Sequence, residues 1–146
     1  MRESIGGTWI FSLVIVFIVL FTGYLAVSVN YSRAFKVKNG IINIIEENEG
    51  HNSNAEEEIT SYLNGSGYFV FGSCASNETG YGRQSSQSNR FRYCVSKVPN
   101  NETTIPSTRY YVRVFFRLDL PVFGELLTFP ITGETKAVYF ANDNVN

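Results

Sequence analysis

The chain has 146 residues, of which 44% are hydrophobic, 15% aromatic and 17% charged, and its formal net charge is −1. It contains one histidine and two cysteines. If the cysteines pair, a metal site would need carboxylate ligands alone, and a Ser-His-Asp triad would have to use His51. The composition therefore argues against metalloenzymes and hydrolases.

The N-terminal segment is the most informative part of the chain. Residues 4–32 carry no charged side chain, and the apolar run from Trp9 to Val29 is 21 residues long. A helix of that length spans the roughly 30 Å hydrocarbon layer of a bilayer. Trp9 and Tyr31 flank the run, where amphipathic rings favour the headgroup region. We therefore predict a transmembrane helix within residues 1–32, with the membrane lipid bilayer as its partner.

A cleaved secretory signal peptide is the alternative, and Ala26-Val27-Ser28 would be an acceptable cleavage site. Signal peptides have a shorter apolar region, of about 7–15 residues, after a clearly basic start. In this chain the run is longer, and Arg2 is offset by Glu3. These features favour a retained anchor.

The helix is predicted to continue through residues 33–50, where apolar side chains recur at steps of three and four. One continuous helix from about Ile5 to Glu46 would be roughly 60 Å long, with Gly40 as a weak point. Its apolar stripe needs a partner, and we expect the domain at residues 51–146 to provide it. The stripe consists of Ala34, Val37, Ile41, Ile44 and Ile45.

A polar linker at residues 49–54 contains His51, which we expect in the least ordered part of the chain. A short second helix follows, with Asn54 as its predicted N-cap and glutamates 56–58 in its first turn, where the helix dipole favours negative charge. Residues 64–67, rich in glycine and serine, end it. Its apolar side is formed by Ile59, Tyr62 and Leu63.

From Tyr68 onward the hydrophobic pattern has a period of two, which is typical of strands. In Tyr110–Leu120 the even-numbered residues are apolar and are expected to face a core. In a second strand Arg90 and Arg92 are expected to face outward. Its inward residues are Phe91, Tyr93 and Val95.

Two more strands are predicted at Tyr68–Phe71 and Leu127–Tyr139, and Pro130 places the latter at a sheet edge or bulge. Residues 120–124 indicate a bend or a helical turn. Four antiparallel strands beside a helical stripe predict one small α+β domain.

The two cysteines, Cys74 and Cys94, lie in a segment rich in glycine, serine and aromatic residues. A single pair in a small β-rich domain predicts a disulfide, and so an oxidising compartment outside the membrane. Two unrelated thiols in a cytosolic domain are the alternative. The positive-inside rule favours it, because residues 33–38 carry more positive charge than the N-terminus does. We give the cysteines more weight and predict a cytoplasmic N-terminus and an extracytoplasmic domain.

No motif in the chain indicates catalysis. The glycines at 65–67 and 80–82 lack the lysine and the following helix of a phosphate-binding loop. We therefore expect no enzyme, no cofactor, no metal and no small-molecule substrate. Nucleic acid is a poor candidate as a partner behind a membrane anchor.

Four arginines form a possible interaction surface, because in strands they would share one face of the sheet. Such a face would suit an acidic partner or an anionic polymer, whereas an ordinary solvated sheet face is the simpler interpretation. The four are Arg90, Arg92, Arg113 and Arg117.

The layout resembles the type IV pilin superfamily, in which an N-terminal membrane helix continues as an amphipathic helix and is followed by a small α+β domain. The run from Tyr110 to Leu127, with Leu120-Pro121 after a strand, is similar to the TadE/TadF-type minor pseudopilins of tight-adherence (Tad) pilus systems. The segment Phe129–Thr135 is similar to their final strand, which carries small residues and threonine. Pilin precursors of this group have Glu at the fifth position after a glycine. In this chain the fifth residues after Gly6 and Gly7 are Phe11 and Ser12.

The resemblance implies a minor or accessory component of a Tad-type pilus or secretion apparatus, with other pilin-like subunits or platform proteins as partners. Subunits would associate laterally, because glycines permit close helix approach. A free-standing single-pass binding or sensing module outside the cell is the alternative. The residues expected to pack helices are Gly6, Gly7 and Gly23, together with Ile41, Ile44 and Ile45 of the stripe.

Overall fold

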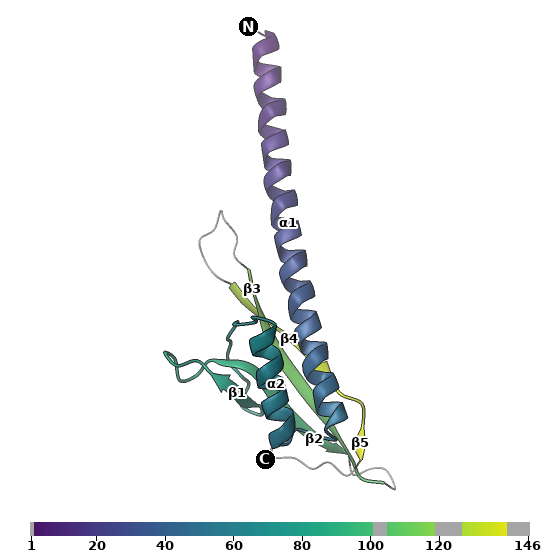
Figure 1. The fold of residues 1–146 in the computed structure, drawn as a ribbon. Helices are drawn as coiled ribbons and strands as arrows, with labels where there is room; N and C mark the ends of the chain where they lie inside the picture. Colours follow the sequence, from purple (N-terminus) through teal and green to yellow (C-terminus); the bar gives the residue numbers. More distant parts are fainter. Residues whose placement is uncertain (1, 101–104, 119–126, 140–146) are drawn as a thin grey trace.

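The computed structural model describes residues 2–100, 105–118 and 127–139. The fold is α+β, as predicted, with a long helix, a short helix and an antiparallel sheet (Figure 1). The elements are α1 (Arg2–Glu47), α2 (Ser53–Gly65), β1 (Thr79–Arg83), β2 (Phe91–Asn100), β3 (Ser107–Leu118), β4 (Leu127–Glu134) and β5 (Val138–Tyr139).

Helix α1 is continuous over 46 residues, which corresponds to about 70 Å. The predicted uninterrupted helix is confirmed. Its N-terminal half extends away from the rest of the chain (Figure 1). Within Gly6–Glu47 the helix is long and apolar enough to cross a bilayer, with a mean hydropathy of 2.7 over its most apolar stretch, none of which is buried.

The C-terminal half of α1 packs on the sheet and on α2 through one stripe, as predicted. Gly40 lies within this half and does not break the helix. A Cβ atom at Gly40 would come within 2.5 Å of the Tyr62 ring, so the missing side chain lets α2 pack closely. The buried stripe consists of Ala34, Val37, Ile41, Ile44 and Ile45, each at most 8% exposed.

Helix α1 ends in a Schellman-type cap. The backbone N–H of Gly50 donates to the carbonyl of Ile45 at 2.9 Å, and that of Glu49 donates to the carbonyl of Glu46 at 3.3 Å. Glu49 has a φ of 54°, in the left-handed region that a side chain disfavours. The cap reverses the chain, and α2 then packs against α1 (Figure 1).

Helix α2 begins two residues earlier than predicted, because Asn52 rather than Asn54 is its N-cap. The side chain of Asn52 accepts a hydrogen bond from the Ala55 N–H at 2.9 Å. Glu56 lies in the first turn. The buried side of the helix consists of Ala55, Ile59 and Leu63.

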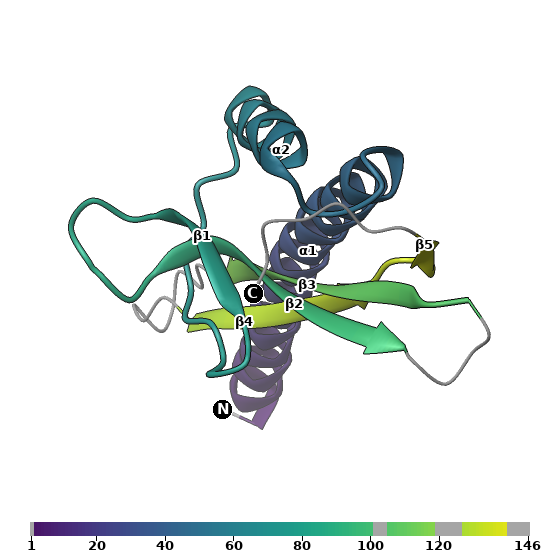
Figure 2. The ribbon, with the colours of Figure 1, turned by 90° about the horizontal axis from the view of Figure 1, so that it is seen from below.

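The sheet has the order β1-β2-β3-β4 with antiparallel pairs, and β5 pairs with the beginning of β3. Helix α2 and the C-terminal half of α1 lie on one face of the sheet (Figure 2). Among the described strands β4 pairs with β3 alone, so the edge position predicted from Pro130 is confirmed. The core between helices and sheet includes the predicted inward residues Tyr93, Val95, Tyr110, Val112 and Val114.

One predicted strand is absent, and another strand was not predicted. Residues 68–71 form no strand, and Gly72, which follows them, makes a single isolated β-bridge with Phe91. The first strand is instead Thr79–Arg83, which sequence reasoning missed because Gly80 and Gly82 provide no strand-forming side chains.

The last predicted strand is divided into β4 and β5, since Thr135 leaves the ladder and bonds to the backbone of Tyr110. The bend predicted at residues 120–124 lies outside the described residues.

The segment between α2 and β1 covers part of the second face of the sheet. Phe115 alternates with the core residues of β3 and so faces away from the helices, yet it is 3% exposed. Tyr68 donates a hydrogen bond to the Phe115 carbonyl, and Gly72 lies against the Phe115 ring. The sheet is therefore buried on both faces at this point.

Candidate functional site

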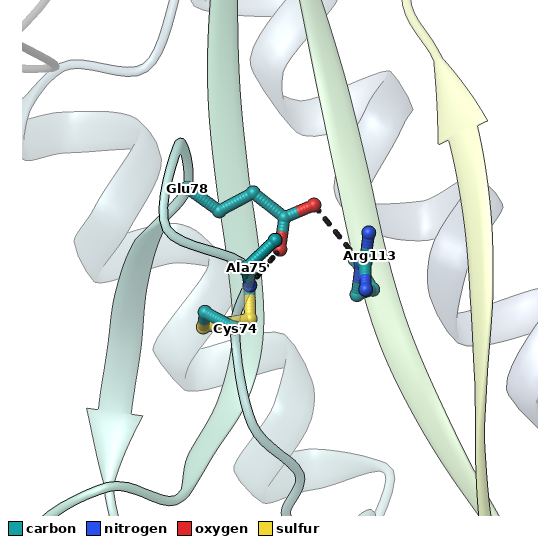
Figure 3. Close-up of a disulfide and its surroundings, with 5 residues drawn as sticks. Cys74, Ala75, Glu78 and Arg113 are labelled. Carbon is teal, nitrogen blue, oxygen red and sulfur yellow. Dashed lines mark hydrogen bonds and ion pairs between the residues drawn. A yellow bond between two sulfur atoms is a disulfide. The ribbon is translucent and has the colours of Figure 1, made fainter.

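The predicted disulfide between Cys74 and Cys94 is present, with a Cα–Cα distance of 5.7 Å (Figure 3). It joins the segment after α2 to the middle of β2. Glu78 brings a third possible metal ligand within 4.8 Å of the two sulfur atoms. Because both sulfurs form the disulfide, they offer no thiolate to a metal ion.

The carboxylate of Glu78 links the disulfide segment to β3 (Figure 3). Its Oε2 accepts a hydrogen bond from the Ala75 N–H at 2.9 Å. Its Oε1 lies 2.9 Å from Nε of Arg113, a distance typical of an ion pair, although the angle is not that of a hydrogen bond. Arg113, predicted as part of an interaction surface, is thus held within the chain.

The prediction that Arg92 faces outward was wrong. Its guanidinium donates to Oδ1 of Asn64 at 2.7 Å and to the Tyr68 carbonyl at 2.8 Å, and it lies 4.8 Å from the centre of the Phe69 ring. Desolvation lowers the pKa of Arg92, but a guanidinium remains charged at neutral pH. Arg92 therefore ties β2 to the end of α2.

The other two predicted arginines, Arg90 and Arg117, are exposed. Arg90 precedes β2 and Arg117 lies near the end of β3. The four arginines therefore do not form a single free basic face. Alternation along a strand predicts a face of the sheet, but it does not reveal which side chains a neighbouring segment covers.

The residues predicted to pack helices fall into two groups. Ile41, Ile44 and Ile45 are buried against the chain's own domain. Gly6 and Gly7 are exposed, and beyond the neighbouring helix backbone no described atom lies within 4 Å of the position that a Cβ would take, while Gly23 is half-buried. The glycines thus lie in the half of α1 that the domain leaves uncovered.

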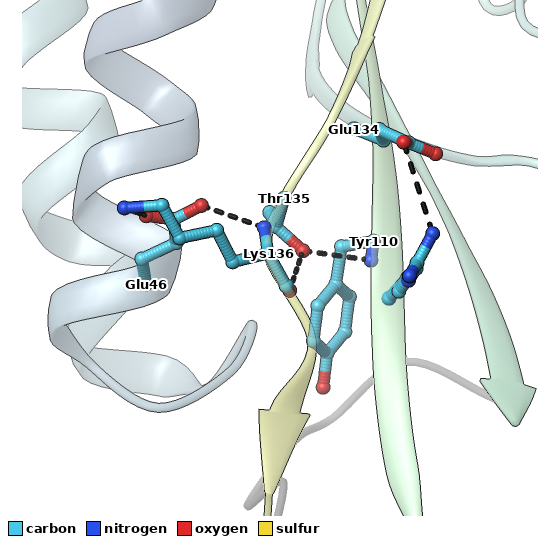
Figure 4. A network of polar contacts seen from close by, with 6 residues as sticks. Glu46, Tyr110, Glu134, Thr135 and Lys136 are labelled. Atoms are coloured by element: carbon cyan, nitrogen blue, oxygen red, sulfur yellow. Dashed lines mark hydrogen bonds and ion pairs between the residues drawn. The ribbon is translucent and has the colours of Figure 1, made fainter.

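A polar network joins the end of α1 to the connection between β4 and β5 (Figure 4). Glu46 accepts a hydrogen bond from the backbone N–H of Lys136 at 2.7 Å, and its other oxygen lies 3.7 Å from Nζ of the same residue. Oγ1 of Thr135 accepts from the Tyr110 N–H at 3.0 Å and donates to the Lys136 carbonyl at 2.9 Å. These contacts fix the C-terminal part of the sheet against α1.

The prediction that His51 lies in the least ordered part of the chain was wrong. Its side chain is fully buried, with its ring centre 4.3 Å from that of Tyr81 and its Nε2 3.3 Å from the hydroxyl of Tyr93. Burial, followed by the charge of Glu56, raises the pKa of Tyr93. The only histidine of the chain therefore belongs to the core.

Four aromatic rings form a row, here called the aromatic row, across α1, β3 and β4. Their centres are separated by 6.4 Å between Phe35 and Tyr31, by 5.9 Å between Tyr31 and Phe116, and by 5.4 Å between Phe116 and Phe129. Tyr31 was predicted to lie at the end of the apolar run. Its contact with Phe116 was missed because it depends on how the sheet packs on α1, whereas Phe35 lies one helical turn after Tyr31.

No protein-family model, curated protein or solved structure matches this chain.

Proposed function

We propose that the protein is a single-pass membrane subunit whose mechanism is lateral association with other single-helix subunits. In this proposal it is a pilin-like minor or accessory component of a Tad-type pilus or secretion apparatus. The observation that carries the proposal is the division of α1 into an uncovered apolar half and a half that carries the domain.

The uncovered half of α1 supports the proposal because it would expose a large apolar surface to water. Its large apolar side chains are about half exposed or more, among them Trp9 at 71% and Leu20 at 67%. Leu, Ile, Val and Phe favour the bilayer centre, whereas an exposed apolar surface of this size is unfavourable in water. Lipid, or helices of other subunits within lipid, is the environment that this half requires.

The glycines of this half suit contact between helices. Because no described atom beyond the neighbouring helix backbone lies within 4 Å of the Cβ positions of Gly6 and Gly7, a second helix can approach the backbone there. Association of membrane helices depends on close packing, and small residues permit it. The buried stripe meanwhile holds the domain rigidly on the other half of α1.

The orientation in this proposal is a cytoplasmic N-terminus and an extracytoplasmic domain. The Cys74–Cys94 disulfide supports it, because disulfides persist in oxidising compartments. Labelling of intact cells with a maleimide reagent should modify the two cysteines only after reductant. Labelling of both thiols without reductant, after lysis under thiol-trapping conditions, would instead indicate a cytosolic domain.

The experiment that tests the proposed function is affinity purification of the full chain from membranes in mild detergent, with mass spectrometry of the recovered proteins. Pilin-like subunits, a secretion ATPase or its membrane platform are expected. The variant Gly6→Leu/Gly7→Leu should recover fewer of them, whereas Ile10→Leu should recover the same amount. Recovery of the protein alone would contradict the proposal.

A free-standing anchored binding module is the second candidate. The exposure of Arg90 favours it, because its side chain is accessible to an acidic partner. It predicts that the chain is monomeric in the membrane, and that Arg90→Gln reduces capture of a partner while Gly6→Leu/Gly7→Leu does not.

A further inference from the structure

Strands β3 and β4 lie along α1, and two contacts define how far they reach. A Cβ atom at Gly133 of β4 would come within 2.9 Å of the side chains of Lys38 and Ile42. Phe116 of β3, four residues beyond the partner of Gly133 in the ladder, meets the ring of Tyr31. The two strands therefore advance along α1 toward its N-terminal half, as Figure 1 shows.

The end of this strand pair reaches the depth of the apolar run. Leu118 and Leu127 are paired with each other two residues beyond Phe116, up to about 7 Å further along the strands. Tyr31 follows Val29, the last residue of the apolar run, by two residues, which is only about 3 Å along the helix axis. The pair of Leu118 and Leu127, here called the β3–β4 end, is therefore level with the last turn of the apolar run.

The side chains at and near the β3–β4 end are apolar and exposed. Leu127 is 47% exposed and Phe129 is 39% exposed, and Tyr31 on the adjacent face of α1 is exposed as well. Aromatic rings favour the headgroup level of a bilayer, and leucine favours its hydrocarbon layer. An α1 that crosses the bilayer with its apolar run would bring these side chains into contact with lipid, where their exposure is favourable.

The outer edge of β4 suits lipid better than another strand. Among the described strands β4 pairs with β3 alone, so no described strand covers its second edge. Pro130 lies within β4 and has no N–H to donate. Proline at an edge opposes the addition of a further strand, and it also removes a polar group that lipid could not satisfy.

We propose that the β3–β4 end is embedded in the bilayer interface, with Phe129 at the level of the headgroups and Leu127 at the boundary of the hydrocarbon layer. The inference rests on the proposed membrane anchor and makes lipid the partner of the exposed aromatic row. Because the buried stripe holds the domain on α1, embedding this end would fix the depth and the tilt of the helix in the membrane.

The test is quenching of tryptophan fluorescence by spin-labelled phosphatidylcholine in nanodiscs that hold one copy of the full chain. Trp9 is the only tryptophan, so Trp9→Phe provides a background without it. In that background, Phe129→Trp and Leu127→Trp report on the β3–β4 end. Tyr139→Trp is the matched control, because Tyr139 is similarly exposed but pairs with Ser107 at the opposite end of β3.

A nitroxide on the lipid headgroup should quench Phe129→Trp about as strongly as it quenches Trp9 of the wild type. A nitroxide on the acyl chain should quench Leu127→Trp more than Phe129→Trp. Neither lipid should quench Tyr139→Trp, which acrylamide in the water should quench instead. Urea unfolding of each variant checks that the domain is folded, and the exposed positions leave room for the larger ring.

Equal quenching of Phe129→Trp and Tyr139→Trp by either lipid would overturn the inference. Quenching of Phe129→Trp by acrylamide alone would place this end in water, and protection from both acrylamide and lipid would indicate a second protein surface; each result contradicts the proposal. Wild-type Trp9 tests the anchor separately. If lipid quenches Trp9 but not Phe129→Trp, the anchor is kept and the interfacial contact is lost, whereas a Trp9 that lipid does not quench loses both.

Discussion

Gly72 lies directly against the ring of Phe115, so closely that a Cβ atom at Gly72 would come within 2.1 Å of it. Gly72 also exchanges two backbone hydrogen bonds with Phe91, at 2.9 and 3.0 Å, which prevent it from moving away. In a domain with helices on one face of the sheet only, Phe115 would face water. The contact with Gly72 covers it on the second face.

We predict that Gly72→Ala lowers the free energy of unfolding by about 1–3 kcal/mol, because the methyl group overpacks the Phe115 ring. Urea unfolding of the full chain in nanodiscs, followed by near-UV circular dichroism, measures the loss. Gly65→Ala is the control, since no atom lies within 4 Å of its Cβ position. Equal stability of Gly72→Ala and wild type would contradict this account of the contact.

The ion pair between Glu78 and Arg113 carries a second prediction. The Glu78 side chain is 5% exposed, while that of Arg113 is 27% exposed and keeps some contact with water. Glu78→Gln leaves the arginine without its counter-charge near the sheet, and we expect a loss of about 1–3 kcal/mol.

The matched control is Glu134→Gln, in a pair with Arg109 whose partners are about half exposed and 3.8 Å apart. It should cost about 0.5 kcal/mol or less, because water screens such pairs. If Glu78→Gln and Glu134→Gln had the same effect in urea unfolding, the Glu78 ion pair would contribute no more than a surface contact.

The elements of this fold that sequence reasoning predicted are those with a clear hydrophobic period. The long helix, its stripe through Ile41 and Ile45 and the inward face of Tyr110–Val114 follow from periods of about 3.6 and 2. The disulfide followed from cysteine number and context. Each of these signals is local, and each was confirmed.

The wrong predictions concern contacts that depend on distant parts of the chain. His51 is polar and follows a glycine, so nothing nearby indicates that Tyr81 and Tyr93 bury it. Arg92 alternates with core residues, yet Asn64 and the Tyr68 carbonyl cover it. The aromatic row likewise requires the register that brings Phe116 to Tyr31, which a pattern of single residues does not encode.

The buried tyrosines predict loss of stability at high pH. Burial raises the pKa of Tyr68 and of Tyr93 in the folded chain above the ordinary value of 10.0. A tyrosine with a raised folded pKa stabilises the fold below pH 10, where it is protonated in both states. Above pH 10 the unfolded chain loses these protons first, so the free energy of unfolding falls as pH rises.

Each of the two tyrosines contributes a slope of at most about 1.4 kcal/mol per pH unit. Urea unfolding at several values between pH 9 and pH 11 would measure it. Tyr93→Phe should reduce the slope, whereas Tyr139→Phe, at an exposed position, should leave it unchanged. A slope that is the same in Tyr93→Phe and wild type would show that Tyr93 does not contribute.

The cap of α1 allows a stabilising substitution. Glu49 adopts a φ of 54°, which costs a residue with a side chain about 1–2 kcal/mol relative to the right-handed region. Glycine avoids that cost, but its greater freedom in the unfolded chain lowers the free energy of unfolding by about 0.4–1 kcal/mol. We therefore expect Glu49→Gly to raise the free energy of unfolding by about 0.5–1 kcal/mol.

Glu47→Gly, two residues earlier and at the last residue of the helix, should instead lower it, by about 0.5 kcal/mol. Urea unfolding measures both variants, and each of them removes one glutamate charge from the same turn. A gain in stability for Glu49→Gly together with a loss for Glu47→Gly would therefore be due to the left-handed conformation and not to the lost charge. A change of the same sign in both variants would contradict the role of the cap.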